Sequence, residues 1–468
     1  MWSSAVWLWL LGYFALPAHA TFCWVDVTED FHKNAPLLLK YTTNEVIYPD
    51  TAKSDSVRFS FGERLRVACP RGNVTVFGSS IKSSEVPLKC YAISFFDVVG
   101  TNYVAPFGRI SCSEPAQAVA RADPNEICPE GRIGRIGFSM RNEAFLPTIE
   151  RICFNQLENR PSWAKSTVTT ALRSRRASVR KPVYQKGEFY ENVEIGPETF
   201  SIEQQRARFK ALLKKDELVD KYLAVGPKKP ALRRKSKKYA RQAAEITTTS
   251  TTTTSTTTTT LPSTPTTTTT MSPTSTTTKP ATAAATASNW LVEGQLVPAS
   301  DMYYKSQQNS TYFYINTLPV WKSIEEGNWK LVEEIVRSTA GQLAVNLDAW
   351  TGGLDNLRYP DADGKEVELS LLSDGSLTVP RYLYKYVHDP VHNYGLVFVT
   401  MNDPYLGMMT ADDHLCTPLD ACQAKYPQFK DATKGYTYCC AIDSSSDFAL
   451  IVADLGVPAF PSSRPFFS

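Results

Sequence analysis

The segment Trp290–Arg337 reads WLVEGQLVPASDMYYKSQQNSTYFYINTLPVWKSIEEGNWKLVEEIVR. Residues two apart on a β-strand share one face, so the side chains of Glu293 and Gln295 are expected to point the same way. Acidic residues recur toward the end of the segment, and Glu326 and Glu334 are expected to lie on a solvated helix face. The segment therefore predicts a strand and a later helix that both carry polar chemistry.

Three motifs in this segment keep a fixed spacing: Glu293-Gly294-Gln295, then Asn316 followed by Pro319-Val320, then Glu325 followed by Gly327, Trp329, Glu333 and Arg337. This spacing resembles that of the DNA/RNA non-specific endonuclease family, the secreted ββα-metal nucleases. In that family one strand carries Arg-Gly-His, a second carries Asn-x-x-Pro-Gln, and a helix carries Asn-x-Gly-x-Trp-x-x-x-Glu-x-x-x-Arg. The resemblance implies that Glu325, Asn316 and Glu333 are metal ligands. It also implies that Gln295, Glu293 and Arg337 occupy the catalytic positions.

The residues at those positions determine what chemistry remains. The resemblance implies that a His deprotonates water, a divalent ion neutralises charge on the phosphate, and Arg side chains clamp it. Gln295 stands where that His belongs, and a carboxamide orients water but does not take its proton. Losing a general base typically lowers the rate by ~10²- to 10⁴-fold. Glu293 stands in place of the Arg and should repel a polyanion. We therefore expect a nuclease fold with an impaired active site.

A rewired active site is the alternative hypothesis. Glu293 would act as the general base of a working endonuclease, and Glu325 would bind Mg²⁺ or Mn²⁺, because Mg²⁺ prefers oxygen ligands. A carboxylate grouped with others around a metal is more often a ligand than a base, which favours the impaired site.

The N-terminus predicts secretion. Residues 1–20 contain a short apolar run that closes on Ala18-His19-Ala20, which is typical of a secretory signal peptide, although no Lys or Arg precedes it. The run is shorter than the ~18 residues that a spanning helix needs. We expect a secreted, extracellular protein with no membrane partner.

The ten cysteines predict disulfides. An even set lies in the first third of the chain and another near its end, which behind a signal peptide indicates an oxidising compartment. Zinc is the alternative, but no Cys-x-x-Cys pair is present. Adjacent Cys439 and Cys440 are expected to pair with different partners.

Residues 21–153 predict a disulfide-bonded β module. Val57, Phe59 and Phe61 alternate with polar residues, Gly62-Glu63 offers a turn, and alternation resumes at Leu65; this pattern predicts a hairpin.

Residues 154–245 form the expected first part of the nuclease-like domain. Residues 204–223 have helical periodicity. The run at 228–241 then carries eight basic residues and no acid. Contact with nucleic acid, a sulfated glycan or another polyanion is one interpretation; protease cleavage and a simple solvated run are the others. The eight candidate contact residues are Lys228, Lys229, Arg233, Arg234, Lys235, Lys237, Lys238 and Arg241.

Residues 246–288 are almost entirely Thr, with Ser, Pro and Ala. Such a segment has too few large apolar side chains to offset the entropy of ordering, and predicts a disordered, O-glycosylated, mucin-like insertion. Asn73 and Asn309 begin N-glycosylation sequons.

Together these features predict an α+β protein: a disulfide-bonded β module, then a ββα-metal nuclease-like domain that is interrupted by the Thr-rich insertion and continues over residues 289–468. The leading functional hypothesis is a secreted, impaired nuclease relative that binds nucleic acid or another polyanion. An active Mg²⁺-dependent endonuclease and a mucin-like structural component are the alternatives.

Overall fold

The computed structural model describes residues 22–27, 31, 34–49, 55–140, 144–174, 181–190, 193–223 and 289–441. These residues belong to one compact unit. The predicted signal peptide, the basic run 228–241 and the Thr-rich insertion lie outside the described residues. Within the described part of the chain, no helix combines the length and apolar character needed to cross a membrane.

The N-terminal module is built from short antiparallel strands in three sheets, ordered β1-β3, β10-β5-β6 and β2-β4-β7-β8-β9. The strands are β1 (Phe22–Asp26), β2 (Leu37–Lys40), β3 (Ser56–Ser60), β4 (Arg64–Ala68), β5 (Val74–Val76), β6 (Ser79–Ser80), β7 (Glu85–Ala92), β8 (Phe95–Val98), β9 (Val104–Pro106) and β10 (Ile110–Cys112), with η2 (Phe107–Arg109) before the last.

The predicted hairpin at residues 57–69 is wrong in its pairing. Both strands form, and the turn between them is present, with the Glu63 amide donating to the Ser60 carbonyl at 2.9 Å. However, β3 pairs with β1, while β4 pairs with β2 and β7. Alternation along a strand indicates which face is buried but not which strand lies beside it.

An eight-stranded antiparallel sheet forms the centre of the molecule, in the order β11-β12-β13-β14-β17-β20-β21-β22. The strands Val119–Cys128, Gly131–Ser139 and Phe145–Asn155 belong to this sheet, so the sheet joins part of the predicted N-terminal module to the nuclease-like region. Its strands are β11 (Val119–Cys128), β12 (Gly131–Ser139), β13 (Phe145–Asn155), β14 (Arg160–Val168), β17 (Leu347–Asn356), β20 (Pro380–Asp389), β21 (Tyr394–Met401) and β22 (Thr437–Ala441). Two-stranded pairs are formed by β15 (Leu291–Gln295) with β16 (Thr317–Trp321) and by β18 (Arg358–Pro360) with β19 (Glu366–Glu368).

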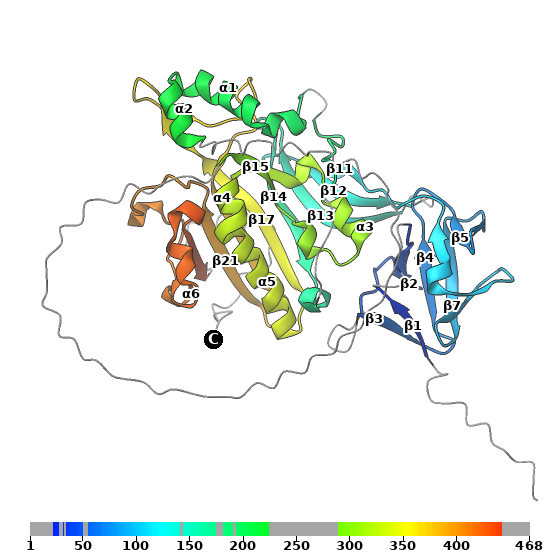
Figure 1. Cartoon of the computed structure of the whole chain (residues 1–468). Helices are drawn as coiled ribbons and strands as arrows, with labels where there is room; N and C mark the ends of the chain where they lie inside the picture. Colours follow the sequence, from blue (N-terminus) through cyan, green and yellow to red (C-terminus); the bar gives the residue numbers. More distant parts are fainter. Residues whose placement is uncertain are drawn as a thin grey trace, which may run out of the picture. The chain divides into compact units, whose positions relative to one another are not determined.

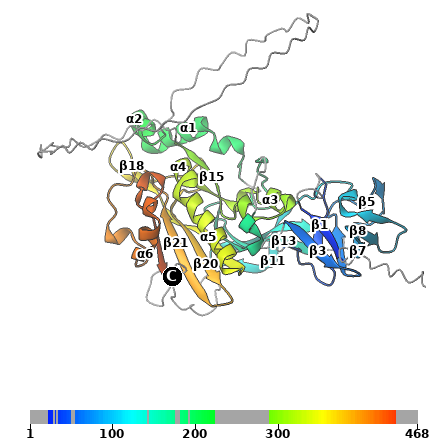
Figure 2. The same cartoon turned by 60° about the horizontal axis from the view of Figure 1, so that its bottom comes forward.

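Helices pack on one face of the large sheet. Figures 1 and 2 show α5 (Lys330–Leu343) running along this sheet, where Val332, Ile335 and Val336 join a core with Leu383 and Phe398. The helical stretch predicted at 204–223 is divided at Lys214, which has a positive φ of 58°. The other helices and turns are η3 (Thr170–Ser174), η4 (Pro197–Phe200), α1 (Ile202–Leu213), α2 (Asp216–Tyr222), η5 (Ala299–Asp301), α3 (Lys305–Ser310), η6 (Tyr314–Asn316), α4 (Lys322–Ile324), η7 (Glu325–Trp329), η8 (Ala411–Asp413), α6 (Asp420–Lys425), η9 (Pro427–Lys430) and η10 (Ala432–Lys434). The protein is richer in strands than the predicted α+β class suggests.

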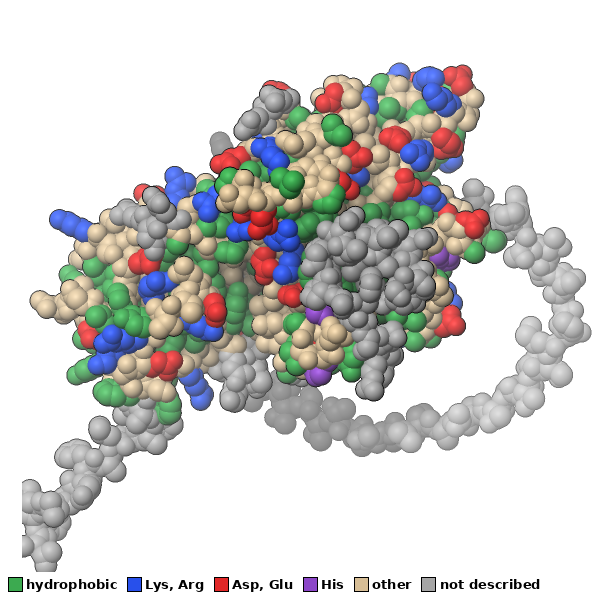
Figure 3. Space-filling model, turned by 180° about the vertical axis from the view of Figure 1, so that it is seen from behind, with side chains coloured by type: hydrophobic (Ala, Val, Ile, Leu, Met, Phe, Trp, Pro, Cys, Tyr) green, Lys and Arg blue, Asp and Glu red, His purple; other side chains and the backbone are tan. Residues whose placement is uncertain are grey.

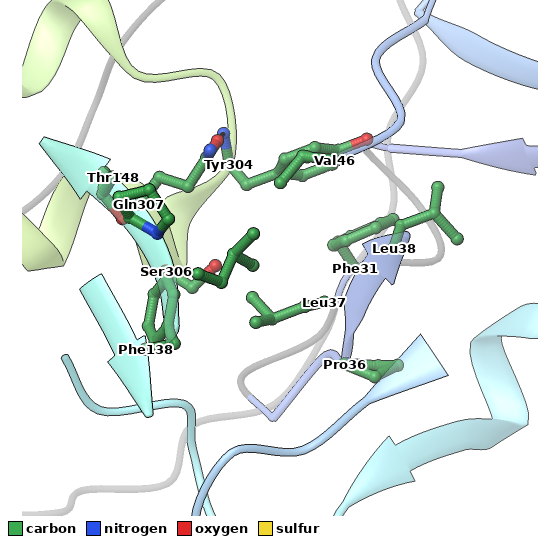
Figure 4. A pocket seen from close by; sticks show the side chains of 12 residues that line it. Phe31, Pro36, Leu37, Leu38, Val46, Phe138, Thr148, Tyr304, Ser306 and Gln307 are labelled. Carbon is green, nitrogen blue, oxygen red and sulfur yellow. Dashed lines mark hydrogen bonds between the residues drawn. The ribbon is translucent and has the colours of Figure 1, made fainter. Parts of the chain in front are cut away.

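The N-terminal module contacts the rest of the unit through α3. Figure 4 shows a small pocket where Phe31 and Leu37 of the module meet Phe138 of β12 and Tyr304 beside α3. The rings of Phe31 and Tyr304 stack with their centroids 5.0 Å apart. Gln307 Nε2 donates to the Tyr48 hydroxyl at 2.9 Å. The loop that follows β15 is thus held against the module.

All ten cysteines form disulfides within their two predicted sets. The pairs are Cys23–Cys90, Cys69–Cys112, Cys128–Cys153, Cys416–Cys440 and Cys422–Cys439. The prediction that adjacent Cys439 and Cys440 have different partners is confirmed.

Candidate functional site

The three motifs meet at a hairpin followed by a helix. Strand β15 pairs antiparallel with β16, which places Gln295 opposite Thr317. The chain then enters α5 through η7, which is kinked at Gly327. A Cβ on Gly327 would lie 2.8 Å from the Lys434 carbonyl oxygen, so only glycine allows this close approach. Spacing along the sequence thus predicted the order and contact of these elements.

The Gln295 side chain forms hydrogen bonds to the loop that connects β15 and β16. Its Nε2 donates to the Thr311 carbonyl oxygen and to Thr311 Oγ1, each at 3.0 Å. Its Oε1 accepts from the Ala299 amide at 3.1 Å. Both ends of the carboxamide are therefore engaged with protein groups at the position where the resemblance implies a general base.

Asn316 holds the same loop. The side chain is fully buried, and its Nδ2 donates to the carbonyl oxygens of Val297 and Thr311, each at 2.9 Å. Its Oδ1 accepts from the Val297 amide at 3.0 Å. Each of these contacts is to backbone, so the structure gives this predicted metal ligand a structural role.

Glu293 forms an ion pair that local sequence does not reveal. Its Oε2 lies 3.1 Å from Nζ of Lys181, a residue far earlier in the chain. The Tyr184 hydroxyl lies 3.5 Å from the Glu293 backbone oxygen. The repulsion expected between Glu293 and a polyanion is therefore offset by an adjacent cation.

Glu325 lies beneath the hairpin on the Gly294 side of β15. A Cβ on Gly294 would lie 3.2 Å from Glu325 Oε2, and alternation along the strand directs Glu293 and Gln295 the other way. Oε2 is buried and lacks a hydrogen-bond partner among the described residues. Burial, followed by the nearby Glu333 charge, raises the pKa of Glu325 well above its ordinary value.

Glu333 and Arg337 belong to a buried charged cluster on α5. Arg337 Nη1 lies 2.7 Å from Asp301 Oδ1 and 3.8 Å from Glu333 Oε2. A second cation, Lys385 of β20, is fully buried and donates to Thr351 Oγ1 at 2.7 Å. Burial lowers the pKa of Lys385, and the charges of Asp301 and Glu333 oppose that change. The buried carboxyl groups of Asp301 and Glu333 thus lie near the buried Lys385 and the partly buried Arg337. The partly buried Glu325 adds a third carboxyl group near Lys385.

The described histidines contact other parts of the molecule. His388 stacks with Tyr386 on the sheet face opposite to Lys385, as alternation along β20 requires. Asp389 binds His392 at 2.7 Å, and His414 packs against Tyr438. Among the described residues, we therefore find no imidazole in contact with Gln295 or Glu325.

The predicted metal ligands fit a divalent ion only in part. In the described residues no group of three or more His, Cys, Asp or Glu side chains is arranged to hold a metal ion. The amide of Asn316 is engaged with backbone, and Glu333 faces Arg337. The orphaned Glu325 Oε2 remains available, and Mg²⁺ commonly retains several waters while binding one or two carboxylates. Glu325 is thus the residue that would hold such an ion.

Lys181, Asp301 and Lys385 belong to the site but were missed in the sequence. Lys385 could have been predicted, because it is a lone cation on the core-facing side of the apolar strand Tyr382–Val387. An unpaired Lys is rarely buried, so such a position indicates a buried partner. Asp301 and Lys181 lie in loop-like sequence and gave no such signal.

The buried Glu333 predicts a pH-dependent stability. Burial, with the Asp301 charge adding to it, raises its pKa from 4.5 to about 7. Between these pH values the folded state keeps a proton that the unfolded state has lost, so stability falls as pH rises through this window, by up to ~3 kcal/mol for this group. Urea unfolding in chelator should show a smaller fall for Glu333→Gln.

Glu334→Gln is the matched control, because Glu334 is the exposed neighbour of Glu333 on α5. It should keep the pH dependence of the unmodified protein. An unchanged slope in Glu333→Gln would contradict the raised pKa.

A hairpin followed by a helix, with acidic and basic side chains at the expected spacings, is the arrangement that defines ββα nucleases. Residues 224–445 match the family model described as DNA/RNA non-specific endonuclease. This match covers slightly less than half of the chain.

Two insect salivary proteins are among the similar sequences. Salivary protein Tsal1 of Glossina morsitans morsitans is 32% identical over 161 residues, which cover 34% of this chain and 40% of that protein. The salivary endonuclease of Lutzomyia longipalpis is 32% identical over 157 residues, which cover 33% of this chain and 38% of that protein. The chain thus matches less than half the length of either relative.

Among solved structures, one titled as the EndoG/EndoGI complex aligns with 57% of this chain and 78% of that chain, at 13% identity and a TM-score of 0.28. This similarity is too low to define a shared fold.

Proposed function

We propose that this protein is a secreted nuclease relative that binds nucleic acid, or a similar polyanion, and hydrolyses it poorly. The match of residues 224–445 to the DNA/RNA non-specific endonuclease model supports nucleic acid as the ligand class. The salivary relatives and the predicted signal peptide support secretion. Basic and acidic side chains are interspersed on the face shown in Figure 3, so attraction should come from local basic sites such as the run 228–241.

The proposal of poor hydrolysis rests on the hydrogen bonds that the Gln295 side chain makes to protein groups. Its amide is bound by the Thr311 and Ala299 groups described above, and it has no titratable proton near neutral pH. A base must accept a proton reversibly, and the described histidines lie elsewhere. The step that activates water is therefore the one we expect to be impaired.

The rewired endonuclease is disfavoured by the Lys181 contact. Glu293 would need to reach the attacking water as a free base, whereas its carboxylate is held by the Lys181 ammonium at 3.1 Å. Glu325 would still bind a hydrated Mg²⁺ or Mn²⁺, which would neutralise phosphate charge. Such binding would aid association with nucleic acid without supplying the missing proton acceptor.

Fluorescence anisotropy with labelled DNA and RNA in chelator tests the binding half of the proposal. The logarithm of the affinity should fall linearly with the logarithm of the salt concentration, as counterions are released from the phosphates. Replacing the eight basic residues of 228–241 by Gln should weaken binding. Binding that is absent or insensitive to salt would overturn the proposal and favour a passive glycosylated scaffold.

A further inference from the structure

The segment Lys181–Tyr190 runs beside the motif hairpin. Its Gln185 amide donates to the Tyr312 carbonyl at 3.0 Å, and the Tyr314 amide donates back to the Gln185 carbonyl at 2.9 Å. The Tyr190 hydroxyl donates to the Tyr314 carbonyl at 3.2 Å. These contacts anchor the segment at several points along the loop that leads into β16, so its first residue is held beside β15.

Lys181 is held from two sides but stays open to solvent. Its Nζ lies 3.1 Å from Glu293 Oε2 and 5.1 Å from the centroid of the Tyr184 ring. The Lys181 side chain is 56% exposed, whereas that of Glu293 is 14% exposed. An ammonium group has three N–H donors, so donors remain for a ligand after the carboxylate is bound. The acid faces inward and the cation faces outward.

The surroundings favour a net attraction for an anion at Lys181. Glu293 is its close acidic partner, with Glu293 Oε2 3.1 Å from Lys181 Nζ, and this carboxylate is the less exposed member of the pair. The sequence directly before Lys181 is also basic, with Arg173, Arg175, Arg176 and Arg180 and no acidic residue. An approaching phosphate would therefore meet the ammonium before the carboxylate.

We propose that Lys181 contacts the phosphate backbone of bound nucleic acid, and that Glu293 and the Tyr184 ring position its ammonium beside the motif hairpin. This inference rests on the proposed nucleic-acid binding. In this arrangement Lys181, which comes from a distant segment, supplies the positive charge that the motif Arg supplies in the family. A phosphate accepts a Lys as a compact point charge, so neither base sequence nor a metal ion is required for this contact.

Charge reversal tests the contact, with anisotropy of a labelled single-stranded DNA measured in chelator over a range of salt. Lys181→Glu should weaken binding at least about tenfold at low salt, as expected for loss of one charge-assisted hydrogen bond. It should also reduce the slope of log affinity against log salt by ~0.7. Glu293→Lys should bind at least as tightly as the unmodified protein.

Lys186→Glu is the matched control, because Lys186 is an exposed lysine of the same segment whose Nζ contacts the Val193 carbonyl. It should change affinity far less than Lys181→Glu. Thermal unfolding of each variant should show that the fold is kept. Equal losses in the two variants would overturn the inference.

The outcomes also distinguish this inference from the function on which it rests. If the unmodified protein shows no salt-sensitive binding, the proposed function and the Lys181 contact are both contradicted. If Lys181→Glu leaves this binding unchanged, only the proposed Lys181 contact is contradicted, and the proposed function stands. If Lys181→Glu loses binding to heparin but keeps binding to DNA, the contact is with sulfated glycans, and the assignment to nucleic acid is overturned.

Discussion

Purified protein supplied with Mg²⁺ or Mn²⁺ should hydrolyse DNA and RNA at least ~10²-fold more slowly than a variant with Glu293→Arg, Gln295→His and Glu325→Asn, in which the Arg, His and helix Asn of the family motif are restored. Restoring the His alone is not expected to suffice. Glu325 and Glu293 would still stand where the family motif has its Asn and its Arg. Release of acid-soluble nucleotides from labelled substrate measures the rate.

Two controls make this comparison specific. Glu293→Gln should leave the residual turnover of the unmodified protein unchanged if Glu293 is not a base; a total loss would support the rewired site. The proposal of poor hydrolysis must be abandoned if the unmodified protein is already as fast as the restored variant.

Asp301→Asn should lower the free energy of unfolding by ~3–5 kcal/mol, because it leaves the charge of Arg337 buried without its closest partner. The Asp301 side chain is 2% exposed, and the Arg337 side chain is 15% exposed. Both groups are therefore poorly placed to recover solvation from water. Urea unfolding at neutral pH measures the loss.

The exposed pair Lys322–Glu326 supplies the control. Its atoms are 2.6 Å apart, yet Glu326 is 63% exposed, so Glu326→Gln should cost no more than ~1 kcal/mol. If both variants lose similar stability, the buried cluster does not depend on the charge of Asp301.

The sequence predicted the elements of the site better than the bonds within it. The spacing of Gly294, Trp329 and Glu333 located the hairpin and helix, because these positions are limited by close backbone approach and by the period of the helix. The partners of Gln295 and Asn316 are backbone groups of an intervening loop. Residue type alone does not tell such partners from a metal or a water.

Contacts between distant segments explain the other differences. Lys181 contacts Glu293 because the segment Lys181–Tyr190 is hydrogen-bonded to the loop before β16. The local sequence pattern does not predict this contact between distant segments. The strands at 56–60 and 64–68 show the same limit, since their alternation was correct while their partners were not. Pattern determines which face of an element is buried, and tertiary packing determines what covers it.

The adjacent cysteines Cys439 and Cys440 attach the edge strand β22 to other segments through two separate disulfides. Neighbouring residues on a strand face opposite ways, and Cys439 lies in the core beneath the helices while Cys440 lies in the core on the far side. One reductive event would thus leave the other bridge in place. Two bridges on one edge strand should therefore resist local unfolding of β22, and with it the proteolysis that begins at such an opened edge.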